Sequence, residues 1–177
     1  MKYHVLSWTI VVRRFDGSGD YNRNWNEYKQ GFGDASGEYW LGNEYLHYMT
    51  SSRAYKLRFD LEDWDGNTAY AEYYTFHVNS ESDNYRLILD FYSGNASAST
   101  SADLASGLGY HNNNQFSTYD RDNDNWVPGS CSINHGNNAG FWFNACDRVN
   151  TNDARQALFW EAWKMQPLKK IAMMFRP

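Results

Sequence analysis

The sequence has few of the features that mark membrane-spanning or nucleic-acid-binding proteins. Its apolar runs are only a few residues long, whereas a membrane-spanning helix needs ~20 apolar residues. No basic run is longer than Lys169-Lys170, in a chain of formal net charge −5. A nucleic-acid-binding surface needs clustered Lys and Arg. We therefore expect neither a membrane nor a nucleic acid among the partners of this chain.

Catalytic motifs are also lacking. No Ser/His/Asp order and no metal-hydrolase motif stands out in the sequence. The densest carboxylates, Glu62, Asp63 and Asp65, fall on a predicted strand and the turn that follows it. We therefore predict that the chain is not an enzyme.

Cysteine and proline are scarce, with two and three residues in 177. Cys131 and Cys146 have no CxxC motif or paired histidines beside them, which argues against a zinc site. Two alternatives remain for these cysteines. They form a local disulfide, which would stabilise the fold by about 3 kcal/mol, or they are two reduced thiols.

Aromatic residues, in contrast, are abundant. Eight Trp, fourteen Tyr and ten Phe make up 18% of the chain, together with thirteen Gly. Such a composition fits a carbohydrate-binding surface, in which rings pack on the CH faces of sugars. It also fits an aromatic core surrounded by many loops.

The pattern along the chain predicts one domain of the α+β class. The clearest strand is 54–63, where Tyr55, Leu57, Phe59 and Leu61 alternate with charged residues. A helix is predicted at 25–32 with Asn24 as its N-cap. Further strands are predicted at 5–15, 68–76, 85–92 and 168–176, a second helix at 44–50, a helical turn at 155–164, and loop over most of 93–155.

An acidic loop offers a candidate metal site. Asp120, Asp122 and Asp124 alternate along the chain, and carboxylates spaced in this way can converge on Ca²⁺. The loop is not an EF-hand, because Asn125 and Cys131 stand where that loop needs Gly and Glu. An irregular calcium site and a solvated acidic turn are therefore both open.

Asn95-Ala96-Ser97 matches the acceptor motif for N-glycosylation. The motif is short, and an unmodified loop is the alternative.

Several longer motifs, in the same order along the chain, resemble those of fibrinogen-like domains, the C-terminal domains of fibrinogen and of the ficolin and tachylectin lectins. The resemblance is nearly continuous over residues 8–147 and patchy after them. The segments that carry it are Trp8–Arg14 with Asp16-Gly17-Ser18, Asn24–Gly33, Gly37–Glu44, Leu61–Ala69, Phe116–Asp124, Ala139–Cys146, Trp160–Lys164 and Arg176-Pro177.

The resemblance implies a twisted antiparallel central sheet with short helices and a loop-rich subdomain for calcium and ligand. Residues 1–177 would form one domain, with about 1–110 and 165–177 in the sheet and helix part and about 111–164 in the loop-rich part. The cysteine-bearing segment that precedes this domain in relatives would be missing. The family is extracellular, which implies a secreted protein and a Cys131–Cys146 disulfide. No signal peptide opens the chain, so a secreted protein would start here at a trimmed or mature end.

The resemblance also implies a set of calcium ligands. They are the carboxylates of Asp122 and Asp124 and the carbonyls of Trp126 and Pro128, with Gly129 as the alternative to Pro128. Asp120 would then be a nearby charge that does not bind the ion.

Lectins of the family bind acetyl groups beside the second cysteine. By resemblance, a cis Ala145–Cys146 peptide bond would aim the N–H groups of Cys146 and Asp147 at the ligand, and His135 would lie near it. Asp147 stands where the family usually has His, so it would accept bonds from sugar hydroxyls or an ammonium group, or be a solvent-exposed turn carboxylate. Trp142 and Phe143 are expected in the core.

These implications lead to one main function and one alternative. The main prediction is a calcium-dependent pattern-recognition lectin of innate immunity that binds acetylated or microbial glycans. The alternative is a protein- or peptide-binding module. Relatives act as multimers, which gain affinity through avidity, so a homo-oligomer is open.

Overall fold

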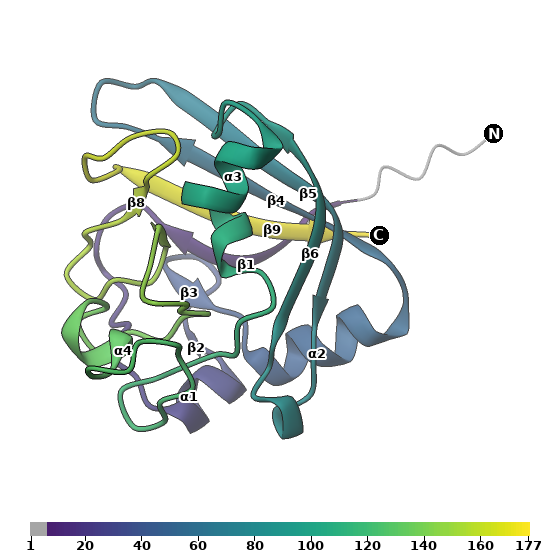
Figure 1. The fold of residues 1–177 in the computed structure, drawn as a ribbon, viewed down its shortest axis with the longest axis vertical. Coiled ribbons are helices and arrows are strands. Elements are labelled where there is room, and N and C mark those ends of the chain that lie inside the picture. The colour runs from purple at the N-terminus through teal and green to yellow at the C-terminus, as the bar shows by residue number, and fades with distance from the viewer. Residues whose placement is uncertain (1–6) are drawn as a thin grey trace.

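The computed structural model describes residues 7–177. The elements appear in Figure 1. The strands are β1 (Thr9–Arg14), β2 (Phe32–Gly33), β3 (Tyr39–Trp40), β4 (Tyr55–Glu62), β5 (Thr68–Val78), β6 (Leu87–Gly94), β7 (Val149–Asn150), β8 (Phe159–Trp160) and β9 (Lys170–Arg176). The α-helices are α1 (Trp25–Gln30), α2 (Asn43–Ser52), α3 (Thr100–Ser106) and α4 (Cys131–Asn134), and the 3₁₀ helices are η1 (Glu81–Asp83) and η2 (Leu108–His111).

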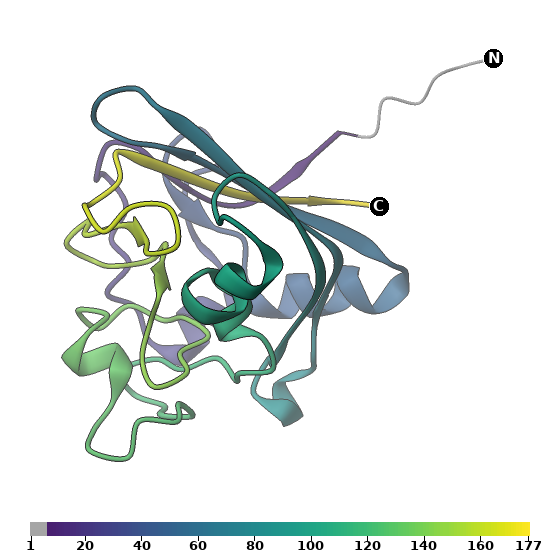
Figure 2. The ribbon, with the colours of Figure 1, turned by 45° about the horizontal axis from the view of Figure 1, so that its top comes forward.

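Seven of these strands form one antiparallel sheet in the order β2-β3-β1-β9-β4-β5-β6. The last strand of the chain, β9, therefore lies in the middle of the sheet, paired with both β1 and β4. Figure 2 shows β9 in yellow between the early strands. The predicted α+β class with an antiparallel sheet is confirmed.

The alternation of β4 decides which face of the sheet is buried. Leu57, Phe59 and Leu61 point into the core, whereas Lys56, Arg58, Asp60 and Glu62 lie on the opposite, outer face. The outer side chains are held by ion pairs, such as Arg58 to Glu72 at 2.9 Å. One face of the sheet thus packs on the rest of the molecule, and the other faces solvent.

The two early helices begin and end close to where the sequence predicts. Asn24 caps α1 by accepting a bond from Glu27 N at 3.0 Å, and the Glu27 side chain accepts from Asn24 N at 2.9 Å. This reciprocal pair is a capping box. The C-terminal end of α2 packs on β5, where Thr50 Oγ1 accepts a bond from Val78 N at 3.1 Å.

Two predictions of local structure need correction. The expected loop at 93–155 contains α3 and η2, because Ser99 caps α3 by accepting from Ala102 N at 3.1 Å. The expected helical turn at 155–164 is present only at residues 161–163, because β8 pairs with β7 and holds residues 159–160 in strand form. Residues 5 and 6 of the expected first strand lie outside the described residues.

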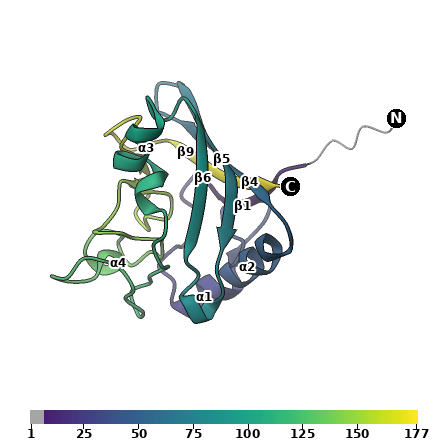
Figure 3. The same cartoon turned by 45° about the vertical axis from the view of Figure 1, so that its right-hand side comes forward.

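The loop-rich part, about residues 111–164, lies against the buried face of the sheet, on the side away from α2 (Figure 3). A continuous aromatic cluster joins it to the sheet and helices, with Trp142 next to Trp40 at 5.9 Å and to Phe116 at 5.1 Å between ring centroids. Trp142 and Phe143 are buried, as expected. Within residues 7–177, no helix has the length and apolar character needed to cross a membrane.

Candidate functional site

The cysteines form a disulfide at the centre of the loop-rich part. Cys131 and Cys146 are bonded, with Cα atoms 5.2 Å apart. Cys131 is the first residue of α4, and Cys146 follows the aromatic run 141–143. The disulfide thus fixes α4 against the loop that carries Asp147, and the predicted pairing is confirmed.

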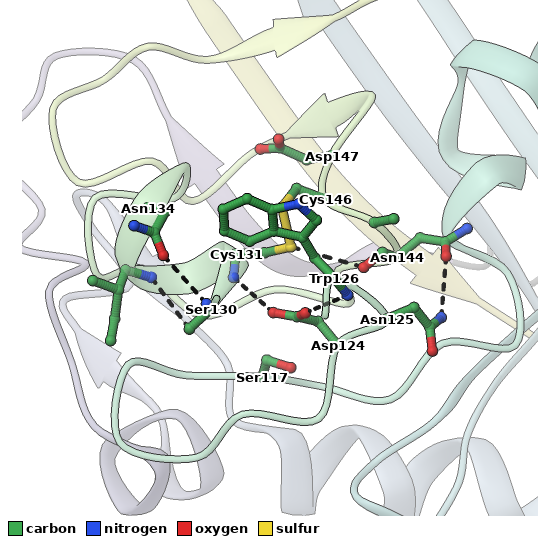
Figure 4. The surroundings of a disulfide bond; sticks show 12 residues. Ser117, Asp124, Asn125, Trp126, Ser130, Cys131, Asn134, Asn144, Cys146 and Asp147 are labelled. Carbon is green, nitrogen blue, oxygen red and sulfur yellow. Dashed lines mark hydrogen bonds between the residues drawn. A yellow bond between two sulfur atoms is a disulfide. The ribbon is translucent and has the colours of Figure 1, made fainter. Parts of the chain in front are cut away.

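The acidic loop lies beside this disulfide (Figure 4). Asp124 accepts bonds from Trp126 N at 2.8 Å and from Cys131 N at 2.7 Å. Asp122 accepts a bond from Asp124 N at 3.2 Å. Burial, together with the neighbouring Asp122 carboxyl, raises the pKa of Asp124. The loop therefore holds two carboxyl groups in mutual repulsion.

These residues fit a calcium site of few carboxylates. A cation between Asp122 and Asp124 would relieve the repulsion that raises the pKa of Asp124. Among residues 7–177, no cluster of three or more His, Cys, Asp or Glu side chains is arranged to hold a metal. The site would consequently need main-chain carbonyls and water as further ligands, which calcium accepts.

Asp120, in the same loop, has a structural role that differs from that of Asp122 and Asp124. Its Oδ1 accepts bonds from Trp25 N at 3.0 Å and from Thr118 Oγ1 at 2.7 Å. Trp25 is the first residue of α1, so the carboxylate lies at the positive end of that helix. Asp120 thereby ties the acidic loop to α1.

The predicted cis peptide bond is wrong. The peptide bonds of the described residues are trans, Ala145–Cys146 included. The loop closes in the trans form through bonds from Asn144 N to Cys146 O at 2.9 Å and from Asn125 N to Asn144 O at 3.0 Å.

Asp147 and His135 flank the disulfide region on the surface. Burial raises the pKa of the Asp147 carboxyl to about 6, and Asn150 Nδ2 donates a bond to its Oδ2 at 2.8 Å. The exposed His135 ring meets Trp126 edge-on, with ring centroids 5.0 Å apart. In Figure 4 the Trp126 indole lies across the disulfide, between Asp124 and Asp147. The predicted site residues are thus brought together. Ala145, also predicted, is exposed and accepts a bond from the Tyr110 hydroxyl at 3.3 Å.

One supporting residue, His111, could not be predicted from the sequence. Its Nδ1 donates to Trp142 O at 2.8 Å, and Nε2 accepts from the N–H groups of Arg148 and Val149 at 3.2 Å each. Burial lowers the pKa of His111 to about 4, so the ring is neutral at physiological pH. It joins the aromatic run to the segment after Asp147. A single His among loop residues carries no pattern that would identify this role.

Two exposed apolar side chains close to Cys131 in the chain were also missed. Val127 is 97% exposed and Ile133, on α4, is 53% exposed. They lie on either side of Cys131 in the chain, and two isolated apolar residues of this kind form no recognisable sequence pattern.

Comparison with known proteins gives clear relatives. The chain is 46% identical to angiopoietin-1 of Sus scrofa over 145 residues, which cover 82% of this chain and 27% of the relative. It is 38% identical to angiopoietin-related protein 7 of Mus musculus over 182 residues, covering 96% and 51% of the two chains. The chain therefore spans about a quarter to a half of the length of these relatives.

Solved structures agree in fold. The fibrinogen-like globe domain of human ANGPTL2 has a TM-score of 0.85 and 39% identity, with 96% of this chain and 80% of that chain covered. A lamprey fibrin D-dimer, solved with the peptide ligand Gly-His-Arg-Pro-amide, has a TM-score of 0.80 and 31% identity, with 96% and 61% covered.

These relatives overturn the main functional prediction. They are angiopoietins and angiopoietin-related proteins, not sugar-binding lectins, and the lamprey relative holds a peptide. The lectin of innate immunity and its glycan partner, acetylated or microbial, are therefore wrong, and the protein-binding alternative is favoured. The sequence motifs did not distinguish the two because lectins and angiopoietin-like proteins share the fold.

The family itself is established by the whole chain. Residues 1–177 match the model of the C-terminal globular domain of fibrinogen β and γ chains. This chain belongs to the fibrinogen C-terminal domain family.

Proposed function

We propose that this fibrinogen-like domain is an extracellular, non-enzymatic module that binds a protein or peptide through its loop-rich part. The observation that carries this proposal is the pair of exposed apolar side chains Val127 and Ile133, which flank Cys131 in the chain, together with the half-buried Asp147, which follows the disulfide partner Cys146. Exposed apolar side chains next to a few placed polar groups are typical of a protein-binding surface. The secreted setting is supported by the disulfide, because such bonds persist in oxidising compartments.

Asp147 gives the proposed surface a preferred ligand chemistry. Its pKa of about 6 leaves the carboxyl ionised at physiological pH, although burial disfavours the charge. A cation that pairs with this carboxylate would compensate its lost hydration. The surface would therefore select a basic side chain or a free amino terminus.

Calcium would order the acidic loop next to this surface. Asp122 and Asp124 would hold the ion together with the carbonyls of Trp126 and Pro128, or of Gly129 in place of Pro128. Bound calcium neutralises the two carboxylates and fixes the loop. Since Trp126 N and Cys131 N both donate to Asp124, the same carboxylate positions the indole and α4. The ion need not touch the ligand to shape the site.

A peptide-binding experiment tests the proposed surface. A library of immobilised peptides is prepared twice, with free and with acetylated amino termini, and the secreted domain is applied with calcium. We expect enrichment of peptides with a free amino terminus or basic side chains. Val127→Asp should weaken binding about tenfold, which corresponds to about 1.4 kcal/mol. Asp147→Asn should remove the preference for cations.

Two controls sharpen that experiment. Tyr48→Asp introduces the same charge at another exposed apolar position, on α2, and should bind as the wild type does. Cation-dependent binding should fall as the pH is lowered through about 6, because Asp147 then becomes protonated. Equal binding by wild type and Val127→Asp would contradict the placement of the surface.

A melting experiment tests calcium. Free calcium at 100 times its dissociation constant stabilises the folded state by about 2.7 kcal/mol. For a domain of this size that raises the melting temperature by roughly 5–10 °C. Asp122→Asn and Asp124→Asn should remove this rise, as measured by calorimetry with and without chelator.

Asp120→Asn is the matched control for calcium. It removes one charge from the same loop, but in this proposal it is not a ligand. It should lower the melting temperature through the loss of its negative charge at the positive end of α1 and retain the calcium-dependent rise. An unchanged wild-type melting temperature with chelator, or a full rise in Asp124→Asn, counts against the site.

A further inference from the structure

The outer face of the sheet contains a groove with a volume of about 580 Å³. Four of its lining residues form a single row across neighbouring strands: Arg13 of β1 pairs with Ala172 of β9, Ala172 with Asp60 of β4, and Asp60 with Tyr70 of β5. Ala172 is the smallest side chain of the row. The groove therefore runs across the strands. The small Ala172 side chain leaves it open in the middle, and polar side chains of the row line its sides.

Asn95 lies at one end of this row. It follows β6, lines the groove, and its Oδ1 accepts a bond from Tyr70 N at 2.8 Å. The side chain is exposed. Asn95-Ala96-Ser97 is the one Asn-X-Ser/Thr motif in the 177-residue sequence. The acceptor amide is thus anchored by its oxygen at the rim of the groove, and its nitrogen is the atom that glycosylation modifies.

We propose that Asn95 carries an N-linked glycan and that this glycan lies in the outer-face groove. In the transfer, Asn95 Nδ2 attacks the anomeric carbon of an oligosaccharide carried on a lipid pyrophosphate. The Nδ2–carbon bond forms, the carbon–oxygen bond to the pyrophosphate breaks, and the lipid pyrophosphate leaves. Nδ2 gives up one proton to a base. The glycan is a covalent part of this chain and not a ligand of the loop-rich site.

The groove has the length and chemistry for the first sugars of such a chain. From the end of β6 to Ala172 on β9 is three strand spacings of ~4.8 Å, or roughly 14 Å. The partly exposed Tyr70 ring offers an apolar face near the attachment point. Asp60 and Arg13 further along offer an acceptor and a donor for sugar hydroxyls. Arg58 stacks on Tyr70, 4.6 Å from the ring centroid, and holds the ring in place.

Because the folded structure covers part of the Asn95–Ser97 motif, the glycan must be transferred before this segment folds. The motif demands a hydroxyl two residues after Asn, so the transferase must read that group. Ser97 is only 4% exposed, and its N–H donates to the Tyr92 hydroxyl at 2.8 Å. Asn95 N and Ala96 N both donate to Tyr70 O at 3.0 Å. The segment is therefore open to the enzyme only in the unfolded chain.

Expression of the whole chain in a eukaryotic secretory host tests the modification. The secreted protein should show a mobility shift that a peptide N-glycosidase removes. Asn95→Asp retains the oxygen that accepts from Tyr70 and should lose the shift, and Ser97→Thr should retain it. Wild type without the shift, or a shift that persists in Asn95→Asp, would overturn the modification.

Amine footprinting with mass spectrometry tests the position of the glycan. Lys170 lines the groove, whereas Lys29 lies on α1, away from it. In the glycosylated protein the reactivity of Lys170 relative to Lys29 should be several-fold lower than in Asn95→Asp. An equal ratio in the two proteins would overturn the placement in the groove, and the shift assay would still report on the modification.

Discussion

Replacing Arg14 with leucine should lower the free energy of unfolding by about 3–5 kcal/mol. Arg14 has no exposed surface and pairs with buried Glu38 at 3.0 Å. Its guanidinium also donates to Thr151 O and Asp153 O at 3.1 Å and lies 3.9 Å from the centroid of the Tyr21 ring. The substitution leaves the Glu38 carboxylate buried without its counter-charge. Urea unfolding of the two proteins measures the loss.

Glu38 explains why the penalty is large. Burial opposes its charge, but the N–H groups of Phe15, Asp16 and Gly17, with Arg14, hold the pKa of Glu38 below its usual value. The carboxylate therefore remains ionised when Arg14 is lost. A group ionised and buried in this way is costly to leave unpaired. The loss should also loosen residues 151–153, since Arg14 links them to β1.

Arg13→Leu is the matched control for Arg14→Leu. The neighbouring Arg13 faces the other side of β1, is partly exposed, and donates to main-chain carbonyls such as Gly37 O at 2.8 Å. Its loss should cost at most about 1.5 kcal/mol. Similar losses for the two variants would show that the buried pair has no special weight.

The elements that the sequence predicted well are those with a strong local signal. β4 follows a strict alternation of buried and half-buried residues, and α1 begins at a complete capping box. In α3, the Ser99 cap was present in the sequence but was hidden in a Ser-rich stretch that reads as loop. The extended form of residues 159–160 depends on pairing with β7, which is tertiary information.

The functional prediction failed for a different reason. Among the residues that carry the family resemblance, Trp40, Phe116 and Trp142 are fully buried. They report the fold, and a shared fold does not determine the ligand. The residues of the proposed binding surface, Val127, Ile133 and Asp147, lie close in the chain to the two cysteines that the disulfide joins. Their exposure and the burial of Asp147 depend on the folded structure, so the motifs could not predict what the domain binds.

The second large effect is expected at Trp142. Its ring lies among Trp40, Phe116 and Phe141, with centroids within 6 Å of its own, and its Nε1 donates to Tyr85 O at 2.7 Å. Trp142→Ala leaves a cavity where the sheet part and the loop-rich part meet. We expect a loss of about 3–5 kcal/mol in the free energy of unfolding.

Trp142→Phe separates packing from hydrogen bonding at this position. It keeps an aromatic ring but leaves the buried Tyr85 carbonyl without its donor, which should cost about 1–3 kcal/mol. Trp64→Ala removes a largely exposed indole from the β4–β5 turn and should change stability by less than about 0.5 kcal/mol. If Trp142→Ala unfolded at the same urea concentration as Trp64→Ala, the aromatic cluster would not be what holds the two parts together. Because the disulfide loop directly follows Trp142, Trp142→Ala should also weaken peptide binding at the surface around Val127. No residue of that surface is changed in this variant.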